Sequence, residues 1–372
     1  MPHTEVDTLF ERLFLERSTF TQKCIMLGGV KKNLCILFKY LGDVAVAVPA
    51  MRALKESRPE DELHILVAEE AVPIVQHLPW VTKVWGLPRK RGKAQLSRSL
   101  PLIAALRGQR FALSVDFVGN DRGALLSWVI GAKERVGLVT ELGFWGRRHC
   151  YNHPILEETI PSVDVHESER HLRLLEGIGA DQNASCALEV HADASLAQEA
   201  RGLLEVGSVV AHLSTSQPKK EWPVEYWREL YLRARDVGVR IVFASGPSER
   251  EQAILKALQE LEPEAPIMGR ISRLDLYLAV LARAGAFISG DTGPLHFAAG
   301  LGIPTLSLFA ATDACRWAPL GAQHRCLTGG GCHCSGHAHV CIHATPCMRT
   351  LKVESAWDAL QRLLQTSNPR SL

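Results

Sequence analysis

The chain has little of what marks a membrane, secreted or nucleic-acid-binding protein. No apolar run among its 372 residues reaches the roughly 18 residues that a membrane-spanning helix needs, and the N-terminus lacks the basic-then-apolar pattern of a secretory signal. The formal net charge of +2 is too small to require a nucleic-acid partner. We therefore expect a cytoplasmic protein with no nucleic-acid partner, whose contact with the inner face of the cytoplasmic membrane is at most peripheral.

The hydrophobic content of 47% is enough for two cores, and the length fits two domains at about 100 to 200 residues each. Short apolar runs alternate with helical patterns such as 48–57, 223–235, 248–261 and 274–283. The runs lie at 34–38, 63–67, 111–115, 209–213, 240–243, 286–289 and 305–309. This order predicts an α/β fold with two parallel sheets, each covered by helices on both faces.

The polar content is densest around 157–171 and 181–195, which places the domain boundary near residue 185. We expect an N-terminal extension over 1–32, a first domain over 33–185, a second domain over 186–350 and a C-terminal helix over 351–372. The extension carries apolar residues in a helical spacing. This pattern favours an amphipathic helix packed on the first domain over a membrane-surface or partner helix.

The most informative stretch is 289–309, where two glycines bound a turn between an apolar run and a helix that begins at Pro294. Such a turn presents free backbone N–H groups to an anion at a helix N-terminus. The candidate ligand contacts are Asp291, Thr292, Gly293 and, one turn into the helix, His296. The alternative is that Asp291 and Thr292 only cap this helix.

The first apolar run is followed by Gly42 and Asp43, at the strand end where parallel sheets bind ligands. The Asp43 carboxylate is either the N-cap of the next helix or a general base in the interdomain cleft. The segment lacks the second and third glycines of a dinucleotide fingerprint, which counts against a dehydrogenase.

Two loops of the second half suit a nucleotide. Thr215, Ser216 and Lys220 can contact a diphosphate, although loops without a ligand have the same composition. After a Gly-Pro turn at 246–247, Glu249 and Glu251 can accept hydrogen bonds from a ribose or favour the start of a helix.

Together these segments resemble the ADP-heptose:lipopolysaccharide heptosyltransferases, glycosyltransferase family 9. The resemblance spans about 33–350. Its carriers are the segments 42–43, 49–54, 116–122, 135–137, 215–223, 246–247, 290–296 and 302–305.

The resemblance implies a GT-B architecture, in which two Rossmann-like domains face each other across a cleft, and inverting transfer without a catalytic metal. The first domain would bind the acceptor and the second the nucleotide sugar. Asp43 would be the base that deprotonates the acceptor hydroxyl. The donor contacts would be Thr215, Ser216, Lys220, Glu249 as the ribose-binding acid, Asp291, Thr292, Gly293 and His296. Arg122 would contact an acidic acceptor sugar.

Five of the ten cysteines lie within 326–347. This segment is similar to the C-terminal cysteine cluster of many family members and to the iron-binding finger of bacterial autotransporter heptosyltransferases. We expect a structural zinc or iron site made by Cys332, Cys334, Cys341 and Cys347, with Cys326 as a competing ligand. Unliganded thiols and labile disulfides are the alternatives. In either case the segment would serve folding rather than transfer.

Three functions follow. The favoured one is transfer of heptose from ADP-heptose, or a related nucleotide sugar, to a lipopolysaccharide core or related glycan acceptor. The second applies the same donor chemistry to a protein serine or threonine. The third is a GT-B sugar-nucleotide epimerase or an inactive nucleotide-sugar-binding module.

Overall fold

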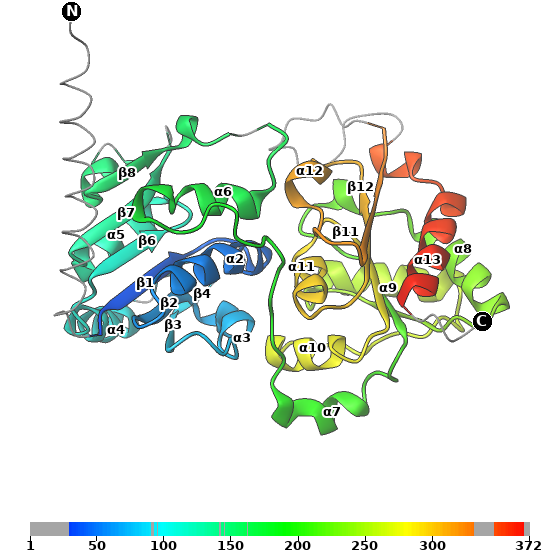
Figure 1. Cartoon of the computed structure of the whole chain (residues 1–372). Coiled ribbons are helices and arrows are strands. Elements are labelled where there is room, and N and C mark those ends of the chain that lie inside the picture. Colours follow the sequence, from blue (N-terminus) through cyan, green and yellow to red (C-terminus); the bar gives the residue numbers. More distant parts are fainter. Residues whose placement is uncertain are drawn as a thin grey trace, which may run out of the picture.

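The computed structural model describes residues 30–90, 93–94, 96–140, 143–144, 146–161, 163–330 and 346–367. They form two halves, each built on a parallel sheet with helices on both faces (Figure 1), which confirms the predicted α/β class. Most of the predicted N-terminal extension, and with it the predicted amphipathic helix, lies outside the described residues. No described helix combines the length and the apolar character that crossing a membrane requires.

The N-terminal half contains a six-stranded sheet in the order β3-β2-β1-β6-β7-β8. All neighbouring strands in it are parallel. The strands are β1 (Lys32–Leu37), β2 (Glu62–Ala68), β3 (Lys83–Leu87), β6 (Leu113–Asp116), β7 (Glu134–Val139) and β8 (His153–Leu156).

Alternating residues of β1 point to opposite faces of this sheet. Cys35 and Leu37 join a core with α2 (Leu41–Ser57), α3 (Val72–Val75) and α6 (Glu167–Arg173). Leu34 and Ile36 face α4 (Leu96–Gly108) and α5 (Asp121–Ile130). The sheet is therefore covered on both faces, as its near-continuous apolar strands predict.

The C-terminal half contains a five-stranded parallel sheet in the order β10-β9-β11-β12-β13. Its strands are β9 (Val209–His212), β10 (Ile241–Ala244), β11 (Ala286–Gly290), β12 (Thr305–Phe309) and β13 (His324–Thr328). One face packs against α8 (Val224–Asp236), α9 (Glu249–Leu261) and α13 (Val353–Ser367). The other packs against α10 (Leu274–Leu281) and α11 (Gly293–Gly300).

One apolar core crosses from one half to the other. Val48 and Met51 of α2 belong to the same buried cluster as Leu295 and Phe297 of α11. Figure 1 shows α2 and α11 side by side where the halves meet, in agreement with their direct contacts. The chain passes between the halves through residues 184–193, which form no helix or strand and include the expected boundary. Short α7 (Ala197–Arg201) follows this connection.

The predicted runs match β1, β2, β6, β9, β10, β11 and β12, whereas β3, β7, β8 and β13 were not predicted. Three of these four lie at sheet edges, and all four carry polar or exposed residues that break an apolar run. The first helix of the described residues, α2, begins at Leu41, earlier than the expected 48–57, and continues through Pro49.

Candidate active site

Two glycines bring the N-termini of α2 and α11 together. A Cβ atom added to Gly42 would lie 3.1 Å from Gly293 Cα and 3.0 Å from His296 Cδ2. A Cβ atom on Gly293 would lie 3.4 Å from Gly42 N. Because neither residue has a side chain, the turn of one half rests directly on the turn of the other. The predicted base and the predicted anion-binding turn therefore lie at one interface.

Asp43 is the third residue of α2, whose N-cap is Tyr40. The interpretation of Asp43 as the N-cap is therefore wrong. Burial raises the pKa of the Asp43 carboxyl from 3.8 to about 6, with Lys39 and Arg316 lowering it and Glu167 and Asp291 raising it. A carboxylate whose pKa lies near neutrality is suited to accept a proton in a reaction.

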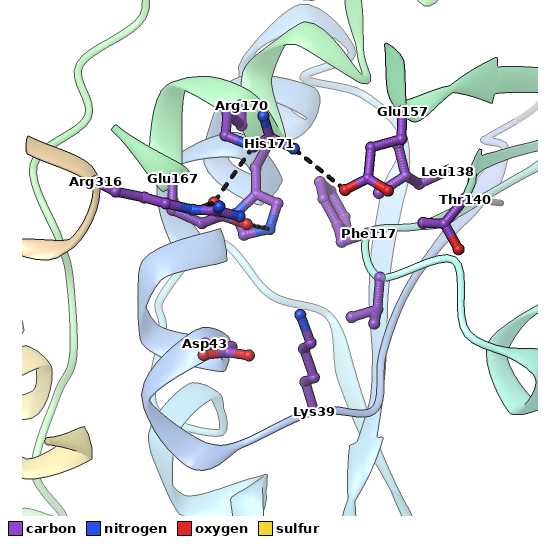
Figure 2. Close-up of a pocket in the computed structure, with 11 residues that line it drawn as sticks. Lys39, Asp43, Phe117, Leu138, Thr140, Glu157, Glu167, Arg170, His171 and Arg316 are labelled. Carbon is purple, nitrogen blue, oxygen red and sulfur yellow. Dashed lines mark hydrogen bonds and ion pairs between the residues drawn. The ribbon is translucent and has the colours of Figure 1, made fainter. Parts of the chain in front are cut away.

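Asp43 lies in what we call the charged pocket, a space of about 80 Å³. The pocket is lined by Lys39, Asp43, Phe117, Val118, Leu138, Thr140, Glu157, Glu167, Arg170, His171 and Arg316. Figure 2 shows Lys39 pointing from the turn before α2 toward the middle of this pocket. The predicted acceptor contact Arg122, near the start of α5, is not among the lining residues.

Most charges of this pocket are paired with one another. Arg170 lies 3.6 Å from Glu157 and 3.3 Å from Glu167. Arg316 contacts Glu167 at 2.7 Å. Among the described residues, neither Asp43 nor Lys39 takes part in an ion pair of this network. The pocket therefore offers a carboxylate and an ammonium group to a polar ligand.

A second space, the interface cavity, has a volume of about 390 Å³, within the range of roughly 300–1,000 Å³ that is common for small-molecule sites. Its lining comes from both halves and is mostly backbone, hydroxyl and apolar. It includes Tyr40, Leu41, Gly42, Glu70, His212, Ser216, Ser245, Gly246, Pro247, Glu251, Ile271, Ser272, Arg273, Leu274, Tyr277, Thr292, Gly293, Pro294 and Phe297. Of the predicted donor contacts, Ser216, Thr292 and Gly293 line it.

Lys220 and Asp291 connect two of the predicted loops. Lys220 Nζ donates to Asp291 Oδ2 at 2.6 Å, and both side chains are largely buried. Thr292 is the N-cap of α11, but its side chain makes no capping hydrogen bond. The Leu295 N–H instead donates to the Thr292 carbonyl at 3.1 Å, and Pro294 has no N–H. The Gly293 N–H, whose residue lines the interface cavity, is therefore the backbone group at this helix start that an anion could meet.

The Thr215 and Ser216 hydroxyls differ in their surroundings. Thr215 is buried, and its Oγ1 donates to the Gln217 carbonyl at 2.7 Å. Ser216 is exposed at the cavity wall. Thr215 therefore shapes the loop, while Ser216 is open to a ligand.

The two candidate ribose acids also differ. Glu249 is exposed and does not line the interface cavity, whereas Glu251 does. Glu251 also forms a capping box with Ser248 at the start of α9. The geometry therefore favours Glu251 over the predicted Glu249.

His296 is buried one turn into α11, and its Nδ1 has no hydrogen-bond partner among the described residues. Burial lowers the pKa of His296 to about 4. The ring is therefore neutral at pH 7, and His296 lines neither the charged pocket nor the interface cavity.

The sequence interpretation missed several pocket residues. Glu167, Arg170 and His171 share one face of α6 at spacings of three and four residues, in a stretch noted only for its polarity. That spacing was the available signal. In the interface cavity, His212 Nδ1 pairs with the Tyr277 hydroxyl at 3.0 Å. No local pattern joined these two residues.

The predicted metal ligands Cys332, Cys334 and Cys341 lie outside the described residues. Of the other two, Cys347 is buried at the start of a short helical turn and Cys326 is exposed in β13. The structural zinc or iron site therefore stays a prediction.

The sequence profile of Glycosyltransferase family 9 (heptosyltransferase) matches residues 100–341. The chain is 24% identical over 293 residues to lipopolysaccharide heptosyltransferase 3 of Escherichia coli, covering 76% of this chain and 84% of that protein. The crystal structure of a family 9 glycosyl transferase from Veillonella parvula DSM 2008 superposes with a TM-score of 0.74 at 18% identity, covering 91% of this chain and 98% of the other.

Escherichia coli heptosyltransferase WaaC with ADP-2-deoxy-2-fluoro heptose superposes with a TM-score of 0.64 at 21% identity, covering 89% of this chain and 99% of the other. These likenesses confirm the predicted GT-B architecture. Since the family profile matches well over half of its length, the chain belongs to glycosyltransferase family 9.

Proposed function

We propose that the protein is an inverting heptosyltransferase that transfers heptose from ADP-heptose, or a closely related nucleotide sugar, to a hydroxyl of a lipopolysaccharide core or related glycan. The observation that carries this proposal is Asp43, a partly buried carboxylate with a raised pKa whose neighbour Gly42 rests on the anion-type turn of the other half. The lipopolysaccharide heptosyltransferase and the ADP-sugar complex among the similar proteins support the choice of acceptor and donor.

In this reaction Asp43 takes the proton of the acceptor hydroxyl while the oxygen of that hydroxyl attacks the anomeric carbon of the donor sugar. The bond from that carbon to the diphosphate oxygen breaks, and ADP leaves with the electron pair. Lys220 and the Gly293 N–H at the start of α11 stabilise the leaving charge. These groups supply positive potential from the chain itself, so the proposal includes no catalytic metal.

The interface cavity would hold the donor. Ser216, Thr292 and Gly293 would contact the diphosphate and sugar, and Glu251 would accept hydrogen bonds from the ribose. The buried Thr215 would keep the loop in shape, and the neutral His296 would lie beside the phosphates.

The charged pocket would hold the acceptor sugar beside Asp43, with Lys39 pointing into the same pocket. A lipopolysaccharide core is anchored in a membrane by its lipid. The proposal therefore includes peripheral contact with the inner face of the cytoplasmic membrane.

A polypeptide acceptor is less favoured, because the related protein reported above is named for lipopolysaccharide. An epimerase needs no second substrate. A separate pocket around Asp43, next to the interface cavity, favours transfer.

The test is mass-spectrometric detection of transfer from purified ADP-heptose to a truncated lipopolysaccharide acceptor, run beside a candidate polypeptide. We expect a heptose mass gain on the glycolipid and none on the polypeptide. A gain on the polypeptide alone would move the acceptor to protein. Conversion of the donor without any acceptor would replace transfer by epimerisation.

A further inference from the structure

The two halves make a second contact beside the one at Gly42 and Gly293. It joins α6 of the N-terminal half to α12 (Ala314–Trp317), a short helix that follows β12 in the C-terminal half. Arg316 Nε donates to Glu167 Oε2 at 2.7 Å across this interface. The next residue, Trp317, has its ring 6.4 Å from the ring of His296 in α11. Helix α12 therefore contacts the N-terminal half and also packs close to α11, which follows the turn at 290–293.

Glu167 is firmly held on its own side of the interface. Its side chain is only 11% exposed, and its oxygens lie 3.3 Å from Arg170 Nε and 3.9 Å from His171 Nε2. Burial raises the pKa of Glu167, but His171, Arg316 and Arg170 together lower it below its ordinary value. Glu167 is thus ionised at neutral pH and is a fixed anchor for Arg316.

The anchor is tied to the helix that carries the base. Ser168, the neighbour of Glu167, donates its hydroxyl to the Val46 carbonyl of α2 at 2.9 Å. Val46 lies three residues after Asp43 on the same helix. Glu167 and Arg316 also line the charged pocket together with Asp43 (Figure 2). A movement that separates the halves would break the pair and open the pocket wall.

We propose that the Glu167–Arg316 ion pair is a latch that closes the two halves over the charged pocket, with Glu167 and Arg316 as positioning residues for Asp43. Neither residue has to touch the reacting atoms. The pair fixes α12 against α6, so that the donor turn and Asp43 keep one relative position during transfer. The activity part of the inference rests on the proposed function, whereas the latch itself does not.

The chain offers a control ion pair. Arg233 contacts Glu354 at 2.7 Å, the same distance as the latch, and the Arg233 and Arg316 side chains are both 33% exposed. Arg233 and Glu354 lie on α8 and α13 of the C-terminal half, and neither lines the charged pocket. Arg233 also contacts Glu229 at 2.6 Å, and Glu354 is 65% exposed whereas Glu167 is 11% exposed. Arg233→Gln therefore serves as the control for loss of a half-exposed arginine and its ion pairs within one half of the molecule.

The first measurement is hydrogen–deuterium exchange on Arg316→Gln, Arg233→Gln and the unaltered protein, without substrate. We expect amides within 166–173 and 314–318 to exchange about fivefold faster in Arg316→Gln, because the local opening that exposes them becomes easier. Arg233→Gln should leave these segments unchanged. Equal exchange in Arg316→Gln and the unaltered protein would overturn the latch, whether or not the protein transfers heptose.

The second measurement is transfer kinetics on Glu167→Gln, Arg316→Gln and the double variant. Each single change should lower kcat/KM about tenfold, and the double variant should lose little more, because both changes break one interaction. A double variant whose loss of kcat/KM equals the product of the two single losses would show that Glu167 and Arg316 do not act through one ion pair. Glu167→Gln leaves cations next to Glu167 without their partner and could fail to fold. In that case the exchange pattern of Arg316→Gln alone decides whether the ion pair holds the two halves together.

The pH profile separates positioning from a general loss of structure. The charged groups that act on Asp43 are Lys39, Glu167, Asp291 and Arg316. Removing the positive charge in Arg316→Gln raises the pKa of Asp43 and should move the acid limb of kcat/KM to higher pH. Removing the negative charge in Glu167→Gln should move it to lower pH. Shifts of the same sign in both variants would overturn the proposed positioning.

Discussion

The charged pocket and the interface cavity share one interface but differ in size and chemistry. The charged pocket measures about 80 Å³ and contains three cations and three carboxylates, most of them paired. The interface cavity measures about 390 Å³ and is lined mainly by backbone, hydroxyl and apolar groups. The smaller site contains Asp43, the proposed base, whose pKa is raised, whereas the larger one is the proposed site of the nucleotide sugar.

This difference suggests a division of labour. Charges in a small buried space shift pKa values and act on the chemical step, while many weak contacts in a larger cavity bind the donor. Changes in the charged pocket should therefore lower kcat, and changes in the interface cavity should weaken donor binding. The predictions below test that division.

The largest effect is expected from Asp43→Asn. Loss of the general base should lower kcat by at least about 10²-fold, while ADP binding measured by calorimetry stays unchanged. The control is Asp236→Asn, at the exposed end of α8. If Asp43→Asn lowered ADP affinity as much as it lowered kcat, Asp43 would also contribute to the interface cavity. The separation between a catalytic pocket and a donor-binding cavity would then be wrong.

The pKa of Asp43 also predicts a stability effect. A carboxyl whose pKa rises from 3.8 to about 6 on folding binds its proton more tightly in the folded state. Its ionisation therefore destabilises the fold as pH rises from about 4 to about 6, by up to about 3 kcal/mol.

Asp43→Asn should thus be more stable than the unaltered protein above pH 6, and this advantage should disappear below pH 4. Urea unfolding at both pH values measures it. An advantage that is the same at pH 4 and pH 8 would mean that the gain does not come from the charge.

The sequence identified the turns at Gly42 and at 290–293 because each combines a buried strand, glycine and a helix start within a few residues. It could not identify the contact between those turns. Nor could it pair Glu167 with Arg316, which lie 149 positions apart. Contacts of this kind depend on how the two sheets pack, which no local pattern records.

The same limit explains two site residues. Glu249 and Glu251 are separated by one residue at the start of α9. Only the orientation of α9 decides which of the two faces the cavity. Edge strand β13 was missed because its polar and half-exposed residues follow no apolar pattern. Strands with a continuous apolar run, edge strand β10 among them, are thus readable from local sequence, whereas interfaces and strands interrupted by polar residues, such as the internal β7, are not.

A smaller effect should follow from Gly42→Ala, which acts where the two sites meet. The new methyl group would lie 3.0 Å from His296 Cδ2 and 3.1 Å from the Gly293 backbone, so the turns must move apart by a few tenths of an ångström. We expect kcat/KM to fall about tenfold, because reactive groups tolerate little misplacement. Gly108→Ala is the control, since its Cβ would meet no atom within 4 Å. Unchanged kinetics in Gly42→Ala would show that the close approach is not needed for transfer.

The smallest effect, and the sharpest test of the interface cavity, comes from the pair Glu251→Gln and Glu249→Gln. Glu251 lines the cavity and Glu249 does not. Loss of one charge-assisted hydrogen bond to a ribose hydroxyl should weaken ADP binding by about five- to tenfold in Glu251→Gln, with kcat nearly unchanged. Glutamine retains an acceptor for the capping box with Ser248, so the start of α9 should persist. Glu249→Gln should bind ADP as the unaltered protein does. If Glu249→Gln binds ADP more weakly than Glu251→Gln does, the start of α9 must rotate when ADP binds. The interface cavity of the ligand-free structure would then differ from the cavity that holds ADP.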